Sequence, residues 1–224
     1  MDIVEAIRSR KSIRGYKPDA VPKEILKEIL GIATRAPSAM NTQPWEITIV
    51  SGEVLDNIRK GNIEMLNSGA KPHPEVPYKT FEGKYRERQV DLAIQLFKLM
   101  GIAREDKEKR GEWTRRGFRF FDAPAGIILS IDRSLINSSA GELMALMDIG
   151  SLAQTICLTA LKYGLGTCIN DQGIMFPEVV RRFTHIPESK LMVICIAIGY
   201  PDWNFPANKL ETGREPPENA VTWL

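Results

Sequence analysis

Arg10-Lys11-Ser12-Ile13-Arg14 is one of the two most informative stretches of this chain. The other is the later stretch Ala36-Pro37-Ser38-Ala39-Met40-Asn41-Thr42-Gln43-Pro44-Trp45. The first stretch follows a short amphipathic start, and it holds cations and a hydroxyl close together. Cations at the end of a helix complement its dipole, and they can also hold a phosphate, because a guanidinium grips two oxygens at once. The second stretch is too rich in Pro, Ser and Asn for a helix or strand. It is therefore a polar loop, the usual place for ligand contacts.

Each stretch also has an ordinary interpretation. Basic residues after a first helix are usually a solvated face, and a Pro- and Ser-rich loop is usually a plain connection. Their occurrence together, in this order and near the start of the sequence, favours a ligand site over these interpretations.

The composition is that of a globular protein in water. Apolar residues make up 43% of the 224 residues and charged residues 26%. The net charge of +2 gives no general reason to expect nucleic acid or a membrane surface as a partner. No apolar run approaches the roughly 20 residues that span a bilayer, and Asp2 and Glu5 interrupt any signal peptide. We expect a cytoplasmic protein.

Thiol or metal chemistry is not expected. Cys157, Cys168 and Cys195 lie in apolar surroundings without a CxxC spacing, which fits buried thiols in a reducing compartment. The two histidines, His73 and His185, lie in loop-like contexts and are not clustered with other ligands. The sequence therefore predicts no catalytic cysteine and no zinc site.

The hydrophobic pattern predicts alternating helices and strands. Apolar stripes and breaker residues indicate helices over 2–10, 22–35, 54–67, 85–100 and 140–163, and strands over 45–50, 124–131 and 191–198, with a short strand after Gly164. The 191–198 strand is continuously apolar, so we expect it to be buried on both faces. Residues 69–83 carry several Pro and Gly breaks and are predicted to be an exposed loop.

Two segments are expected to need partners from elsewhere in this chain or from another chain. The 140–163 helix is apolar nearly all round, so it is predicted to be buried on every side or to form the seam of a dimer. The 199–224 tail ends in Val221-Thr222-Trp223-Leu224. We expect this apolar end to pack as an edge strand on this chain or on a neighbour.

The highly charged segment 104–119 leaves two interpretations open. The favoured one is a solvated helical face. The other is a mobile cover over a ligand site, because Trp113, Phe118, Phe120 and Phe121 are interleaved with the charges or follow them closely.

The chain resembles the flavin-dependent nitroreductase family over essentially its whole length. The two opening stretches, the Gly164–Cys168 turn after the long apolar helix, and Gly199-Tyr200-Pro201 with Arg214 beyond it occur in the family's order. The resemblance implies an α+β protein with a nitroreductase-like α-β-α fold, in which helices flank a central, mainly antiparallel sheet. It also implies an intertwined homodimer with FMN sites at the interface. Residues 1–224 would form a single domain, with 69–121 an excursion covering the active site and 199–224 a tail exchanged between subunits.

The resemblance assigns cofactor-binding roles to three parts of the chain and to one distant cation. It implies that the flavin phosphate, ribityl chain and pyrimidine edge are bound by Arg10, Lys11, Ser12 and Arg14. A loop of the partner subunit would run along the flavin with its Pro37, Ser38, Ala39 and Asn41. The backbone of Leu165 and Gly166 would approach the ring, and Arg214 would be a second phosphate-binding cation. A cation at the flavin N1–C2 edge would stabilise the anionic reduced flavin, and Arg14 is the candidate. Lys11 stands where arginine is frequent, and Ala39 where Gly or Ser is common.

The implied function is that of an FMN-dependent oxidoreductase. It would use NADH or NADPH to reduce nitroaromatics, quinones or similar electron-poor rings by ping-pong hydride transfer, with no metal and no side chain in a catalytic acid–base role. Trp113 and Arg116 are the candidate acceptor-binding residues. A reductive dehalogenase of halophenols and a non-catalytic flavin-binding module remain as alternatives. Lys84-Tyr85-Arg86-Glu87 holds residue types similar to a phenolate-binding trio, but in a different order.

Overall fold

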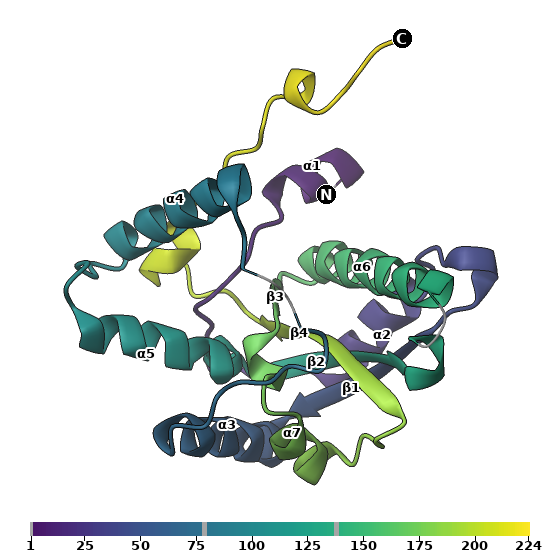
Figure 1. Cartoon of the computed structure of the whole chain (residues 1–224), viewed down its shortest axis with the longest axis horizontal. Helices are drawn as coiled ribbons and strands as arrows, with labels where there is room; N and C mark the ends of the chain where they lie inside the picture. The colour runs from purple at the N-terminus through teal and green to yellow at the C-terminus, as the bar shows by residue number, and fades with distance from the viewer. Residues whose placement is uncertain (1, 78–79, 137–138) are drawn as a thin grey trace.

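A four-stranded antiparallel sheet lies at the centre of the chain (Figure 1). The computed structural model describes residues 2–77, 80–136 and 139–224. Its strands are β1 (Trp45–Ser51), β2 (Ala125–Asp132), β3 (Gly166–Asn170) and β4 (Lys190–Gly199), in the order β1-β2-β4-β3, and all neighbouring strands are antiparallel. The predicted α+β class with a mainly antiparallel sheet is confirmed.

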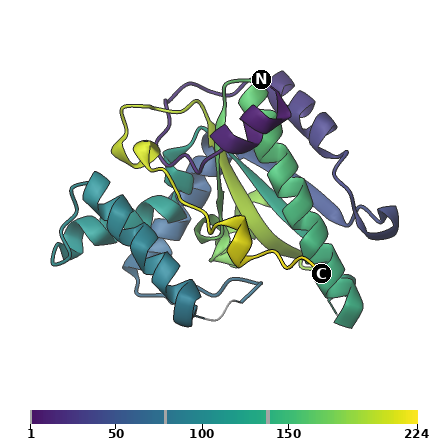
Figure 2. The same cartoon turned by 90° about the horizontal axis from the view of Figure 1, so that it is seen from above.

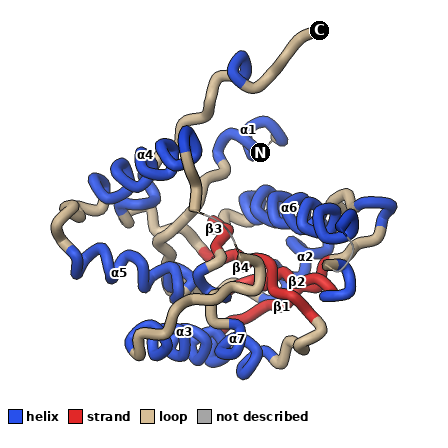
Figure 3. Tube along the Cα trace, viewed as in Figure 1, coloured by secondary structure: helices blue, strands red, loops and turns tan. Residues whose placement is uncertain are grey.

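Helices cover both faces of this sheet (Figure 3). The helices are α1 (Ile3–Ser9), α2 (Lys23–Ala33), α3 (Gly52–Asn67), α4 (Gly83–Leu99), α5 (Lys107–Phe118), α6 (Ser139–Lys162) and α7 (Pro177–Thr184). Those predicted from sequence are confirmed to within a few residues at each end. The α7 helix was not predicted, although Pro177 in its first turn is a helix-start signal.

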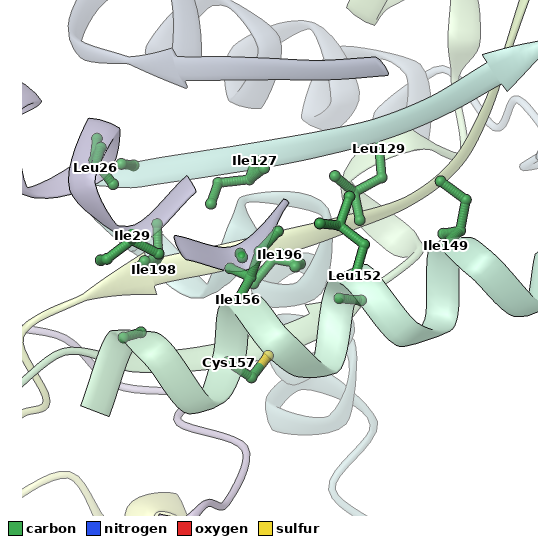
Figure 4. Packing of buried hydrophobic residues seen from close by; sticks show 14 of the residues in the cluster. Leu26, Ile29, Ile127, Leu129, Ile149, Leu152, Ile156, Cys157, Ile196 and Ile198 are labelled. Carbon is green, nitrogen blue, oxygen red and sulfur yellow. The ribbon is translucent and has the colours of Figure 1, made fainter. Parts of the chain in front are cut away.

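The alternation of side chains along the strands builds two cores. On β2, Ile127 and Leu129 face α2 and α6, where they pack with Leu152 and Ile156 of α6 (Figure 4). The intervening Ile128 faces the opposite way, into a cluster with residues of α3 and α7. Because strand side chains point alternately to the two faces, one apolar strand supplies both cores. The burial on both faces that was predicted for the 191–198 strand is confirmed in β4, where Ile196 lies in the first core and Cys195 in the second.

The burial of α6 differs from one of the two alternatives predicted, a helix buried on every side. The other alternative, the seam of a dimer, stays a prediction. The inner face of α6 is buried against the sheet and α2, but Leu143, Met144 and Met147 are 60%, 48% and 60% exposed. In a single chain, therefore, α6 is not buried on every side. Its Glu142–Lys162 part is also long and apolar enough to cross a membrane by length and composition, so the expectation that no stretch reaches that length was wrong. A core helix of a globular protein can have the same length and apolar composition, and the packed inner face of α6 is that of a core helix.

The loop between α3 and α4 is less exposed than predicted. The Glu75 carboxylate accepts hydrogen bonds from Arg181 Nη2 at 2.8 and 2.9 Å and from the Met192 backbone N–H at 2.8 Å, and Arg133 also donates to it. This side chain is only 9% exposed. The ion pair holds one part of the loop against the start of β4, a contact that local composition does not encode. Residues 78 and 79 of the predicted loop lie outside the described residues.

The C-terminal segment has two distinct parts. Pro201, Ala207 and Leu210 are buried in this chain's own fold. Beyond them the chain extends away from the body of the molecule (Figure 1), and Trp223 is 90% exposed. The prediction that the apolar end packs as an edge strand on this same chain is therefore wrong. The alternative, packing on a neighbour, remains a prediction.

Candidate functional site

A cavity of about 820 Å³ lies between the segment after α1, helix α4 and the C-terminal segment. Its volume is in the range typical of small-molecule and cofactor sites. It brings together five of the residues predicted to bind a cofactor, although Arg214 is some 200 positions from the others. The lining residues are Arg10, Lys11, Ser12, Arg14, Arg88, Asp91, Leu92, Gln95, Leu210, Thr212, Gly213, Arg214 and Glu215.

The N-terminal cations are held in place by the edge of the sheet. Ser12 forms a parallel bridge with Thr167 of β3, and the Ile13 N–H donates to the Thr167 carbonyl at 2.9 Å. Gly166 allows this close approach, because a Cβ there would lie 2.5 Å from the Ile13 side chain. Leu165 and Gly166 thus adjoin the 10–14 segment, but neither lines the cavity in this chain.

Asn208, which the sequence analysis did not identify, fixes the backbone at Arg14. Its Oδ1 accepts from the N–H groups of Arg14 at 2.7 Å and Gly15 at 3.2 Å. Its Nδ2 donates to the carbonyls of Gly15 at 2.7 Å and Asp202 at 2.8 Å. The side chain is 1% exposed, so all four bonds form away from water. Asn208 therefore locks the N-terminal cation segment to the C-terminal segment.

The cavity is strongly cationic. Arg10, Lys11, Arg14, Arg88 and Arg214 line it, against the carboxylates Asp91 and Glu215. Two of these cations are paired, with Lys11 Nζ 2.6 Å from a Glu211 oxygen and Arg88 Nη2 2.8 Å from a Glu215 oxygen. Hydrogen bonds from Asn219 and Arg88 lower the pKa of Glu215. Among the described residues, Arg10 and Arg14 take part in no salt bridge, so their guanidinium groups are available to an anionic ligand.

Arg88 is a further cavity residue, one that the sequence analysis did not assign to the cofactor. It lies on one face of α4 with Asp91, Leu92 and Gln95, at the three- and four-residue spacing of a helix face. That spacing was a usable signal within a helix that had been predicted. Arg214 differs, because its Nη1 folds back onto Thr212 Oγ1 at 2.8 Å and the Gly213 carbonyl at 2.8 Å. Its charge is thereby held at the edge of the cavity.

The Pro37–Asn41 loop does not line the cavity in this chain. Figures 1 and 2 place it beyond α6, on the side of the molecule away from α4. The Ala39 N–H donates to both carboxylate oxygens of the buried Asp148, at 3.1 and 3.2 Å, and Ser38 Oγ accepts from the Gln43 N–H at 3.0 Å. Met40, Asn41 and Gln43 have φ angles of 49°, 57° and 47°, a costly conformation for residues other than glycine. Side-chain and backbone bonds thus hold a strained, protruding loop, and backbone strain of this kind concentrates at functional sites.

Trp113 and Arg116 lie below the cavity rather than on its lining. Arg116 Nη2 donates to the carbonyls of Arg14 at 3.2 Å and Phe121 at 3.3 Å, and its guanidinium lies 4.7 Å from the centre of the Phe205 ring. Burial lowers the pKa of Arg116, opposed by its partner Asp122. Trp113 packs at 6.1 Å from the Phe121 ring. Contact of either residue with an acceptor stays a prediction, and the inward packing of α5 favours a solvated helix over a mobile cover.

The three thiols offer no nucleophile. All three cysteines are free and buried, and burial raises the pKa of Cys157 to about 11 and the pKa values of Cys168 and Cys195 above their ordinary range. A reactive cysteine needs the opposite shift. Across residues 2–77, 80–136 and 139–224, His, Cys, Asp and Glu side chains do not gather into a group of three that could hold a metal ion.

A family model and several known proteins match most of the chain. The model of the nitroreductase family matches residues 7–200. The chain is 31% identical to a 4-nitrobenzoate reductase of Nocardioides sp. (strain LMS-CY), covering 97% of this chain and 88% of the relative. It is also 31% identical to a nitrobenzene nitroreductase of Ectopseudomonas oleovorans, covering 99% of this chain and 96% of the relative.

Solved structures of two proteins have the same fold. An FMN- and NADPH-dependent nitroreductase, NfnB, from sphigopyxis sp. strain HMH superposes with a TM-score of 0.92 at 26% identity, over 100% of this chain and 99% of that chain. The FMN-dependent NfnB of Mycobacterium smegmatis, in complex with NADPH, superposes with a TM-score of 0.90 at 26% identity, over 99% and 97%.

Proposed function

The chain belongs to the nitroreductase family, and on this premise we propose that it is an FMN-dependent oxidoreductase that uses NADH or NADPH to reduce nitroaromatic compounds. The observation that carries this proposal is the cationic cavity, which joins Arg10, Lys11, Ser12 and Arg14 to the distant Arg214. The relatives of the chain named above are reductases of nitroaromatic compounds, and a solved structure of the same fold is an FMN- and NADPH-dependent nitroreductase.

The residues of the cavity fit the chemistry of FMN. The cofactor has a phosphate dianion at one end and a flat ring with a polar pyrimidine edge at the other. Arg10, Lys11 and Arg214 would hold the phosphate through charge-assisted hydrogen bonds, and Ser12 offers a hydroxyl beside them. When bound, FMN supplies two-electron transfer between a nicotinamide and an aromatic acceptor.

Arg14 has the main electrostatic role in this proposal. Its guanidinium would stabilise negative charge at the N1–C2 edge of the reduced ring, and its own position is set by Asn208 at its N–H and Arg116 at its carbonyl. Leu92 and Leu210 supply the apolar part of the lining and exclude water from it. Because the bound cofactor would supply the electron transfer, the cavity needs no side chain as a catalytic acid or base.

A second copy of this chain would complete the site. The Pro37–Asn41 loop lies away from the cavity of its own chain, so we assign its Pro37, Ser38, Ala39 and Asn41 to the cavity of a partner subunit. The exposed α6 residues Leu143, Met144 and Met147 offer an apolar surface for such a partner. The exchanged tail narrows to residues 216–224, because residues up to Glu215 pack in their own chain or line its cavity.

The domain and location follow the same proposal. Residues 1–224 would form one domain, and of the 69–121 excursion it is α4 that would form a wall of the active site. The free, buried cysteines support a cytoplasmic location.

The decisive test uses the purified protein. We expect it to be yellow and to release FMN, not FAD, on denaturation. Under anaerobic conditions NADH or NADPH should bleach the flavin, and a nitroaromatic should restore its absorption. A protein that remains colourless with added FMN would overturn the proposal. Bleaching without re-oxidation by any nitroaromatic or quinone would instead indicate a flavin-binding module.

A further inference from the structure

The outer face of α4 borders a second cavity, of about 660 Å³, that shares no residue with the cavity assigned to FMN. Helix α4 contributes Arg88 and Leu92 to the first cavity, and Val90 and Ile94 to the second. The helix is therefore a common wall between the two cavities. The lining residues of the second cavity are Arg86, Gln89, Val90, Ala93, Ile94, Phe97, Lys98, Ile102, Arg104 and Arg110.

The charges on this lining are all of one sign. It holds Arg86, Lys98, Arg104 and Arg110 and no carboxylate. Arg86 donates to Gln89 at 2.5 Å, and Arg110 donates to the Arg104 carbonyl at 3.3 Å. In the described part of the chain none of these four cations forms a salt bridge. Such a concentration of uncompensated positive charge favours an anionic ligand.

Apart from Gln89, the rest of the lining is apolar, and it is partly open to water. Ile94 is 59% exposed and Val90 is 37% exposed. The Arg110 guanidinium lies 4.9 Å from the centre of the Phe97 ring, so this ring already has a cation on it. A flat apolar ligand would remove these side chains from water, and apolar surface gains free energy when it is buried.

We propose that this second cavity binds an aromatic carboxylate or sulfonate. The aromatic ring lies on Val90, Ile94 and Phe97, and the anionic group meets Lys98 and Arg104 through charge-assisted hydrogen bonds. A neutral ring would lose the charge contacts, and a small inorganic anion would lose the apolar ones. The proposal does not depend on the reaction at the flavin.

The test is a calorimetric titration of the FMN-loaded protein with naphthoate, with uncharged naphthamide as the matched probe. We expect naphthoate to bind at least about tenfold more tightly than naphthamide, because a charged hydrogen bond is worth about that factor or more. The double variant Lys98→Glu/Arg104→Glu should bind naphthoate at least about tenfold more weakly. The same charge reversal at the exposed Lys27 of α2, Lys27→Glu, is the control and should leave the affinity unchanged.

Two further measurements keep this test specific. Ile94→Gln keeps every cation but removes apolar surface, so it should also weaken naphthoate binding. The flavin absorption recorded during the titration separates the two cavities, because a ring stacked on FMN perturbs that absorption and a ring behind α4 does not. The proposal would be overturned if the wild type and the double variant bound naphthoate with equal affinity, or if naphthoate and naphthamide bound with equal affinity. It would also be overturned if all of the binding heat were accompanied by a proportional change in the flavin absorption.

Discussion

The Arg14 N–H and the Asn208 Oδ1 are joined by a 2.7 Å hydrogen bond across 194 positions of sequence. The bond is shielded from water, and the same amide group also holds the backbone of Gly15. The position of the cation assigned to the flavin ring thus depends on a residue that contributes nothing to the cavity lining itself.

Replacing Asn208 with alanine tests this dependence. The change leaves the N–H groups of Arg14 and Gly15 without their acceptor, and a buried unsatisfied group costs about 1–3 kcal/mol. We expect a lower thermal midpoint and weaker FMN binding, measured by calorimetry and by flavin release on ultrafiltration. Asn204→Ala, at an exposed position nearby, is the control and should change neither value. Unaltered flavin affinity in Asn208→Ala would show that Arg14 is positioned by other contacts.

Arg214 provides a direct test of the phosphate assignment. Replacing it with alanine removes one charged hydrogen-bonding partner, which is worth about 1.5–3 kcal/mol. We expect FMN to bind roughly 10–150 times more weakly, since each tenfold corresponds to about 1.4 kcal/mol. Lys209→Ala removes a charge from the same segment outside the cavity lining and serves as the comparison. If both variants bind FMN like the wild type, Arg214 is not a phosphate ligand.

Substitutions of Arg116 and of Trp113 should differ in their effects on FMN content. Arg116→Met removes the donor to the Arg14 carbonyl and the stack on Phe205, so we expect a loss of FMN occupancy. The predicted contact of Arg116 with the acceptor would add a changed ranking of acceptors. Trp113 packs beside Leu210 beneath the lining, and Trp113→Leu should change the ranking of acceptors while keeping FMN. Rates with a panel of nitroaromatics and quinones, alongside flavin content, measure both. Loss of flavin in Trp113→Leu with its ranking intact would make α5 purely structural.

The exposed apolar face of α6 predicts a homodimer. We expect light scattering to give the mass of two chains, with an interface above the roughly 1,600 Å² of standard complexes. Met147→Glu places a carboxylate on this face and should yield monomers that no longer retain FMN, whereas Lys27→Glu should remain dimeric. Removal of residues 216–224 should weaken the dimer without unfolding the chain, because these residues are exposed. A flavin-loaded monomer at micromolar concentration would refute this arrangement.

A single binding position over the ring predicts the form of the kinetics. If the nicotinamide and the acceptor occupy the same place in turn, initial-rate plots at several acceptor concentrations should be parallel, as in other ping-pong reactions. Intersecting lines would show that both substrates are bound at once, which one position over the ring does not allow. NADH and NADPH should be compared under the same conditions.

The sequence correctly predicted the features of the fold that depend on residues close together in the chain. The strands, most helices and the Arg10–Arg14 cation segment depend on periodicity and local composition, and all of these were found. Asn208 and Asp148 were not identified, because their roles arise from contacts with residues far away in the sequence. The buried Glu75 was misjudged for the same reason, since its partner Arg181 lies in the unpredicted helix α7. The exposed side of α6 was predicted as buried because hydrophobicity does not say which chain covers it.

The contact between residues 10–14 and Asn208 determines the order in which the sheet and the cavity can form during folding. Residues 10–14 are synthesised early, but the cavity they line also needs residues 208–215, which follow all four strands of the sheet. The sheet and its two cores can form while the cavity is still open, because the strands pair without any residue after Gly199 and the cores include none after Tyr200. Uptake of flavin by a growing or refolding chain therefore marks a late event. A chain truncated before residue 208 would keep every strand and have no place for the cofactor.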